Sequence, residues 1–176
     1  MALSTVGIVE RCANRQVTVA VLFGVAGCVA GLAWRQERLA GLELDSRGWY
    51  TPEEAAALFN DLERLDANAR AFYATTALTI DMVFPVCYGL LFAVLLFRLF
   101  RSGAPLYLLP LALATADVLE NITVAVLALS HDGAPSPLAW LAAVFTLTKT
   151  VLIVATLAAV CTGCALWLWA RMRRSG

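Results

Sequence analysis

The chain has 176 residues, of which 61% are hydrophobic and 15% are charged, and its formal net charge is zero. Soluble domains are about half apolar and about one quarter charged, so this composition favours a membrane protein. The balanced charge and the lack of a basic tract exclude the footprint of a nucleic-acid-binding protein, and we expect no nucleic-acid partner.

Four long apolar segments predict the fold class. A bilayer core of about 30 Å requires roughly 20 helical residues, and segments of suitable length occur at about 17–34, 71–97, 106–129 and 138–170. We therefore predict an all-α, four-helix transmembrane bundle that forms a single domain over residues 1–176. The expected partners are the lipid bilayer and a lipid or small-molecule ligand.

The first span is rich in glycine. Gly27-x-x-x-Gly31 fits the small-xxx-small pattern that lets two transmembrane helices approach closely. The partner helix is either another span of the same chain or the same span of a second copy. A homodimer through Gly27 and Gly31 is therefore an alternative to packing within the chain.

Between spans one and two, the sequence predicts a short amphipathic helix at about 52–66 in an outer loop. Thr51 supplies an N-cap, Pro52 occupies the first helical position, and Glu54 follows three residues after the cap. Apolar residues then recur at helical spacing, with charged residues on the other face. We expect this helix to lie on the membrane surface or on the end of the bundle, and a lid over a pocket is the alternative.

Span two contains Pro85 in an otherwise apolar run. Proline lacks a backbone N–H and cannot form one helical hydrogen bond, which neighbouring helices must compensate inside a membrane. We therefore expect span two to be interrupted and kinked at Pro85.

Ionisable residues occur at similar depths in spans two, three and four. At about 1.5 Å per residue, they lie roughly 14 to 18 Å from the outer ends of their spans. Charges facing lipid are costly, so these side chains should point inward and meet near the middle of the bilayer. Helical spacing adds polar neighbours on the same faces, and the predicted ligand- or proton-binding set is Asp81, Tyr88, Asp117, Glu120, Asn121, Thr146 and Lys149.

The charges of this set suggest a function. Three carboxylates and one ammonium give a formal charge of −2, and buried charges must pair or be neutralised. We expect Lys149 to pair with one carboxylate while at least one other carboxyl stays protonated, unless a bound cation balances the site. The leading hypothesis is binding or translocation of a small cationic or amphipathic molecule, coupled to protonation.

Two alternatives remain open. The first is an intramembrane enzyme acting on a lipid or isoprenoid, with Asp117 or Glu120 as the catalytic general acid and a partner carboxylate as the base. The second is a structural or assembly subunit of a membrane complex. The sequence does not decide whether the protein is an enzyme.

The sequence favours no metal site and no cofactor. His131, the sole histidine, lies in a loop, which argues against haem, and no Cys/His spacing typical of zinc is present. Cys161-x-x-Cys164 resembles the pair used by membrane proteins of the vitamin K epoxide reductase type. This pair lies near Arg171, however, at the end of the span that the arginine distribution, described next, predicts to be cytoplasmic. That side is not an oxidising compartment.

Arginines cluster at the same predicted side of each span, whereas residues 35–70 on the opposite side carry eight acids against five arginines. Cytoplasmic loops carry the excess of Lys and Arg. We therefore predict a multi-pass protein of the inner cell membrane with both termini cytoplasmic. The arginines that carry this prediction are Arg11, Arg15, Arg98, Arg101, Arg171, Arg173 and Arg174.

Three resemblances follow from local patterns. The pattern Y-x₇-D-x-x-x-P from Tyr73, followed by D-x-x-E-N from Asp117, resembles uncharacterised bacterial four-helix integral membrane proteins over most of the chain. The stretch from Asp117 is also weakly similar to D-L-E-N-I of microsomal glutathione transferases, although no arginine precedes it here and it lies in the third span. The overall plan weakly resembles the emopamil-binding and sterol-isomerase superfamily, whose cavity binds sterol-like amines. Its histidine and tryptophan positions do not map onto this chain, so no residue role is carried over.

Overall fold

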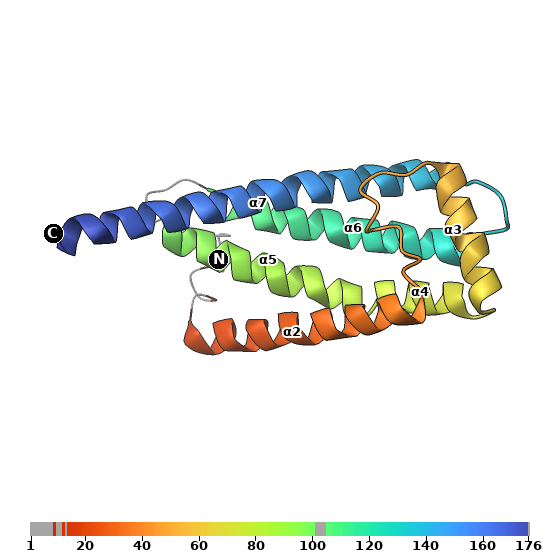
Figure 1. The fold of residues 1–176 in the computed structure, drawn as a ribbon, viewed down its shortest axis with the longest axis horizontal. Coiled ribbons are helices and arrows are strands. Elements are labelled where there is room, and N and C mark those ends of the chain that lie inside the picture. Colours follow the sequence, from red (N-terminus) through yellow and green to blue (C-terminus); the bar gives the residue numbers. More distant parts are fainter. Residues whose placement is uncertain (1–8, 10–11, 13, 101–104, 176) are drawn as a thin grey trace, which may run out of the picture.

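The computed structural model describes Val9, Cys12 and residues 14–100 and 105–175, with side chains as far as Arg173. These ranges form helices joined by turns and loops, and they contain no strand. The helices are α2 (Arg15–Arg38), α3 (Pro52–Leu65), α4 (Ala69–Ala77), α5 (Ile80–Leu99), α6 (Leu108–Ser130) and α7 (Leu138–Ser175) (Figure 1).

Four helical segments are long and apolar enough to cross a membrane, namely α2, α4 together with α5, α6, and α7 as far as Arg173. The prediction of an all-helical protein with four candidate membrane spans is therefore confirmed. The first span is longer than predicted, because α2 continues through Trp34 to Arg38. Among the arginines used for orientation, Arg11 and Arg101 lie outside the described residues, as does the side chain of Arg174.

The second span is interrupted between α4 and α5, at Leu78 and Thr79. Thr79 has φ −120° and ψ −83°, and its hydroxyl donates a hydrogen bond to the carbonyl of Thr75 at 2.7 Å. α5 then runs without a break through Pro85. The expected interruption at Pro85 is therefore wrong in position, and no glycine or proline marks the observed one.

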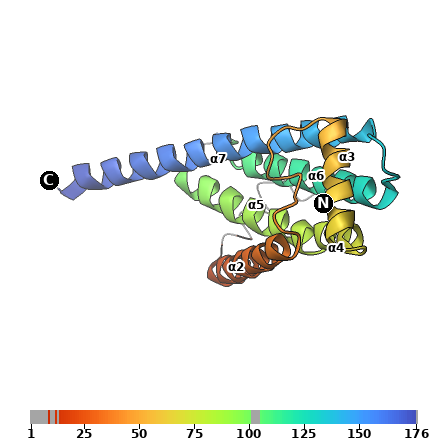
Figure 2. The ribbon, with the colours of Figure 1, turned by 45° about the vertical axis from the view of Figure 1, so that its right-hand side comes forward.

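The long helices lie side by side. In Figure 1, α5 lies between α2 and α6, and α7 lies along α6. α2 packs against α5, α5 packs against α6, and α6 packs against α7, with further contacts between α5 and α7. α3 crosses the end of these helices and contacts α4 and α7 (Figure 2). α2 and α7 are therefore the outermost of the long helices, and α5 and α6 lie between them (Figure 1).

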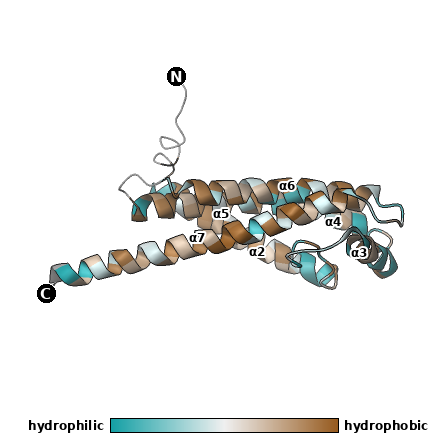
Figure 3. Ribbon diagram, turned by 90° about the horizontal axis from the view of Figure 1, so that it is seen from above, coloured by the Kyte–Doolittle hydropathy of each residue, from teal (hydrophilic) through white to brown (hydrophobic). Residues whose placement is uncertain are grey.

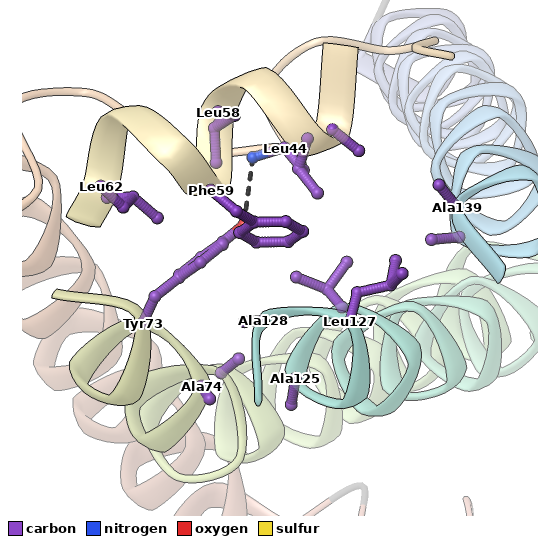
Figure 4. Packing of buried hydrophobic residues seen from close by; sticks show 14 of the residues in the cluster. Leu44, Leu58, Phe59, Leu62, Tyr73, Ala74, Ala125, Leu127, Ala128 and Ala139 are labelled. Carbon is purple, nitrogen blue, oxygen red and sulfur yellow. Dashed lines mark hydrogen bonds between the residues drawn. The ribbon is translucent and has the colours of Figure 1, made fainter. Parts of the chain in front are cut away.

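A compact apolar core lies beneath α3. The helix begins at a capping box, in which the Thr51 side chain accepts from the Glu54 N–H at 3.3 Å and the Glu54 carboxylate accepts from the Thr51 N–H at 2.7 Å. This start fixes which face of α3 turns inward. Figure 4 shows the result, with Phe59 of α3 packed among Tyr73 of α4 and Leu127 of α6.

Away from this core, the apolar surface of the long helices is largely exposed. Hydrophobic residues extend along α2, α5, α6 and α7 (Figure 3). Only 6% of the most apolar window of α2 and 11% of that of α7 is buried within the protein. Exposed apolar faces of this extent are costly in water and suit a lipid environment, which suggests a multi-pass membrane protein.

Candidate functional site

The seven residues predicted as a site lie on three of the long helices. Asp81 and Tyr88 are on α5, Asp117, Glu120 and Asn121 are on α6, and Thr146 and Lys149 are on α7. Six of them are buried, and the side chain of Lys149 is 17% exposed. The structure divides them between two ionic clusters instead of one.

The first group, the Lys149 cluster, joins α5, α6 and α7. The Lys149 ammonium lies 3.2 Å from Asp117 Oδ1 and forms an ion pair with Glu120 Oε2. The Tyr88 hydroxyl donates to Asp117 Oδ2 at 2.7 Å, and the Thr146 hydroxyl donates to Glu120 Oε1 at 2.5 Å. Lys149 therefore contacts two carboxylates, where the sequence analysis expected one.

The second group, the Arg35 cluster, contains a cation that the sequence analysis assigned to the outer loop. Arg35 lies in the last turn of α2 and is only 2% exposed. Its guanidinium contacts Glu43 Oε1 at 2.8 Å, Asp45 Oδ2 at 3.0 Å and Asp81 Oδ2 at 2.5 Å. It also lies over the ring of Tyr73, 5.5 Å from the ring centre. A buried guanidinium is costly unless its donors are paired, and these three carboxylates pair it.

Asp81 therefore has Arg35, and not Lys149, as its counter-ion. The sequence signal for this partner was an arginine that directly follows an apolar span, with acidic residues at 43 and 45 nearby. Such a residue is ordinarily an interfacial arginine with its charge in water. Its burial depends on the fold of the following loop, which helical spacing does not reveal.

The loop of residues 39–51 folds inward against the helices. Positive φ angles at Ala40 (51°), Gly41 (75°) and Gly48 (74°) permit its sharp turns. The N–H of Leu44 donates to the hydroxyl of Tyr73 at 3.0 Å, which ties the loop to α4 (Figure 4). The turns direct the side chains of residues 43, 45 and 50 toward the two clusters.

Burial changes the acid–base properties of this loop. Loss of hydration raises the pKa of the Glu43 carboxyl above its ordinary 4.5, although Arg35 acts in the opposite sense. Burial also raises the pKa of the Tyr50 hydroxyl to about 12, so this group stays neutral. Asp45 Oδ1 is buried with no hydrogen-bond partner among the described residues. A buried carboxylate oxygen of this kind needs a donor.

Asn121 has a structural partner. Its side-chain amide donates to the backbone carbonyl of Asp81 at 2.7 Å. In an unbroken helix that carbonyl would accept from the N–H four residues later, but this position is Pro85, which has no N–H. Asn121 therefore replaces the missing helical hydrogen bond. This contact explains an amide in an apolar candidate span without a ligand.

A cavity of about 470 Å³ lies beside both clusters. Its polar lining residues are Asp45, Asp81, Tyr88, Asp117, Lys149 and Thr150. Its apolar walls come from α2, α5 and α7, and it is partly open to the outside of the protein. The apolar lining residues are Val25, Leu32, Phe84, Leu91, Phe92 and Ile153.

The cavity separates the predicted site residues into two kinds. Asp81, Tyr88, Asp117 and Lys149 line it, whereas Glu120, Asn121 and Thr146 do not and lie behind it. Together the two clusters hold five carboxylates and two cations, which gives a formal charge of −3 when every group is ionised. The lining of the cavity thus combines apolar side chains with the carboxylates of Asp45, Asp81 and Asp117.

Within the described residues, no group of three or more His, Cys, Asp and Glu side chains is arranged to hold a metal ion. No protein-family model matches the chain, and no curated protein or solved structure gives a match. The site is therefore interpreted from its own geometry.

Proposed function

We propose that this chain is a multi-pass protein of the inner cell membrane, with both termini cytoplasmic, that binds or translocates a small cationic or amphipathic molecule. The observation that carries the proposal is the cavity of about 470 Å³, which is lined by apolar side chains and by the carboxylates of Asp45, Asp81 and Asp117. Ligand sites are typically concave, mostly apolar and supplied with a few polar groups, at volumes of roughly 300–1,000 Å³.

The excess of carboxylates favours a cation. A formal charge of −3 in a buried site is costly, and it is reduced by protons or by a positively charged ligand. Binding of a cation would then release protons from the clusters, which couples occupancy to pH. A filled core with Lys149 bonded to every carboxylate would have favoured a structural subunit instead, whereas Lys149 contacts Asp117 and Glu120 and Asp81 pairs with Arg35.

Residue counts give the height of the site in the proposed membrane. At about 1.5 Å per residue, Arg35 lies roughly 30 Å beyond Arg15, and Asp81 lies roughly 26 Å beyond Arg98. Tyr88, the partner of Asp117, lies only about 15 Å beyond Arg98. If these cytoplasmic arginines mark the inner boundary, the site rises from the middle of the bilayer to its outer boundary. α3 and the loop of residues 39–51 then cover its outer end.

For the enzymatic alternative, Asp117 is the better placed of the two candidate general acids. Asp117 lines the cavity and accepts the hydroxyl of Tyr88, whereas Glu120 is fully buried behind Lys149 and Thr146. A lipid in the cavity would therefore contact Asp117 first.

The proposal is tested by blocking the cavity. Ile153→Trp places a large side chain into the cavity wall, whereas Val154→Trp adds the same side chain at a neighbouring position that is 63% exposed and does not line it. Native mass spectrometry of the full-length protein, purified from membranes, should detect a co-purifying amphiphile in wild type and Val154→Trp. The species should be absent from Ile153→Trp and reduced in Asp117→Asn. Identical spectra for all four proteins would refute the proposal.

A further inference from the structure

We propose that the ligand is a single-chain amphiphile with a protonated amine head that carries N–H donors, and that Asp45 and Asp81 hold this head. The inference rests on the proposed function and specifies its ligand class. It follows from the size of the cavity, from the carboxylate acceptors in its lining and from its apolar and aromatic lining residues.

The size of the cavity limits the ligand. A water molecule occupies about 30 Å³ of liquid, so about 470 Å³ holds roughly fifteen groups of that size. A two-chain phospholipid has several times more heavy atoms than this. A single alkyl chain with a small head fits, and its end can leave through the open side.

The head is selected by a carboxylate oxygen of Asp45 that has no donor among the described residues. Asp117 has both oxygens engaged, one by the Tyr88 hydroxyl and one by Lys149. Asp45 and Asp81 each give one oxygen to Arg35, and the second oxygen of Asp45 is buried with no hydrogen-bond partner. A carboxylate oxygen in this state needs an N–H or O–H donor. A protonated amine supplies this donor together with a positive charge.

Asp45 reaches the cavity from the loop of residues 39–51. Tyr50 of the same loop is 0% exposed, and its hydroxyl has Thr146 as a side-chain partner beside the charges of Glu120, Asp45 and Lys149. The loop therefore brings one unsatisfied carboxylate oxygen, Asp45 Oδ1, to the cavity.

The walls set the path of the alkyl chain. Phe84, Tyr88 and Phe92 recur at helical spacing along α5 and line the cavity, and Phe84 packs edge-on against Tyr88 with ring centres 5.1 Å apart. Aromatic rings suit both an alkyl chain and a nearby cation. α2 and α7 contribute further residues to the lining of the same cavity. The chain thus extends along α5 and meets the lipid between α2 and α7.

Competition binding tests the inference. Purified full-length protein in detergent is incubated with radiolabelled dodecylamine, and the bound label is displaced by unlabelled dodecylamine or dodecyltrimethylammonium. Both compounds are cations with the same chain, but the quaternary head has no N–H. The amine should displace the label at a concentration lower by about tenfold or more, the effect of one charge-assisted hydrogen bond. Equal potency of the two compounds would refute the amine head.

Two variants test whether Asp45 of the loop holds the amine head. They also distinguish this inference from the proposed function. Asp45→Asn should weaken amine binding to the level of the quaternary compound, while the exposed control Asp61→Asn should bind as wild type does. If Asp45→Asn does not fold, the comparison of the two compounds on the wild-type protein still shows whether the site requires an N–H donor. Specific binding that is blocked by Ile153→Trp but does not distinguish the compounds would overturn this inference and leave the proposed function standing. Binding that is equal in wild type and Ile153→Trp would overturn both.

Discussion

At the scale of single residues, the role of Asn121 depends on a proline of the neighbouring helix. Pro85 leaves the Asp81 carbonyl without its helical donor, and the Asn121 amide supplies one at 2.7 Å. The same contact holds the backbone of Asp81, whose side chain meets Arg35. Asn121 is thus a positioning residue for an acid of the cavity.

This reading predicts a coupling between two positions. Asn121→Ala should destabilise the protein by about 1–3 kcal/mol, because it leaves a buried carbonyl unsatisfied. In a Pro85→Ala background the cost should be much smaller, since the new N–H of residue 85 can bond to the Asp81 carbonyl. Thermal unfolding of the four proteins in detergent measures the coupling. Equal costs in the two backgrounds would show that Asn121 acts in another way.

His131 gives a pH dependence outside the candidate spans. Its ring lies near Phe59 and bonds through Nε2 to Asn60 Oδ1 at 2.9 Å. Burial, with Arg70 in second place, lowers the pKa of His131 from its ordinary 6.5, while Glu63 and Asp132 oppose this change. The unfolded chain then takes up the proton first, so folding stability falls as pH drops through about 6.5. The melting temperature of His131→Gln should decline less between pH 7.5 and 5.5 than that of wild type, and parallel declines would refute this role.

At the scale of helices, Gly89 permits a closer contact than either glycine of the small-residue pattern, Gly27 or Gly31. A Cβ on Gly89 would lie 2.8 Å from Ala114 Cβ and 3.2 Å from the Pro110 carbonyl oxygen. Neither atom can move away easily, so Gly89 permits the contact between α5 and α6. Gly31 faces Ile80 of the same chain, whereas a Cβ on Gly27 would have nothing within 4 Å.

Two glycine variants therefore make a matched pair. Gly89→Ala should cost about 1–3 kcal/mol through overpacking. Gly27→Ala should leave stability unchanged or raise it by about 0.5–1 kcal/mol, since alanine favours the helix. Unfolding in detergent measures both, and native mass spectrometry of Gly27→Ala reports the oligomeric state. Loss of a dimer in that variant would support the homodimer alternative.

The interruption of the second span shows a limit of sequence patterns at this scale. Thr75, Thr76 and Thr79 each donate a side-chain hydrogen bond to the carbonyl of an earlier turn. Hydroxyls that bond in this way destabilise a helix slightly and often bend it. The three threonines therefore favour a bend without fixing where the helix is interrupted, and Pro85, which is the stronger helix breaker, is accommodated by Asn121.

At the scale of the whole molecule, the orientation in the membrane remains a prediction with a direct test. In a cysteine-free background, Asp132→Cys lies in an exposed loop at the α3 end, and Met172→Cys lies at the opposite end of α7, where residue 172 is 65% exposed. An impermeant maleimide should label Asp132→Cys in intact cells. It should label Met172→Cys only after permeabilisation. The reverse pattern would place both termini outside.

The sequence by itself determined the helical class, the number of candidate spans and most of the Lys149 cluster. Hydrophobic length is a local property, and residues one helical turn apart share a face whatever surrounds them. Only the tertiary structure decided that Arg35 is the counter-ion of Asp81, 46 positions later. It also decided that the loop of residues 39–51 turns inward and that a cavity lies beside both clusters. These features depend on contacts between segments that are far apart in the sequence. The residue pattern within one helix carries no information about such contacts.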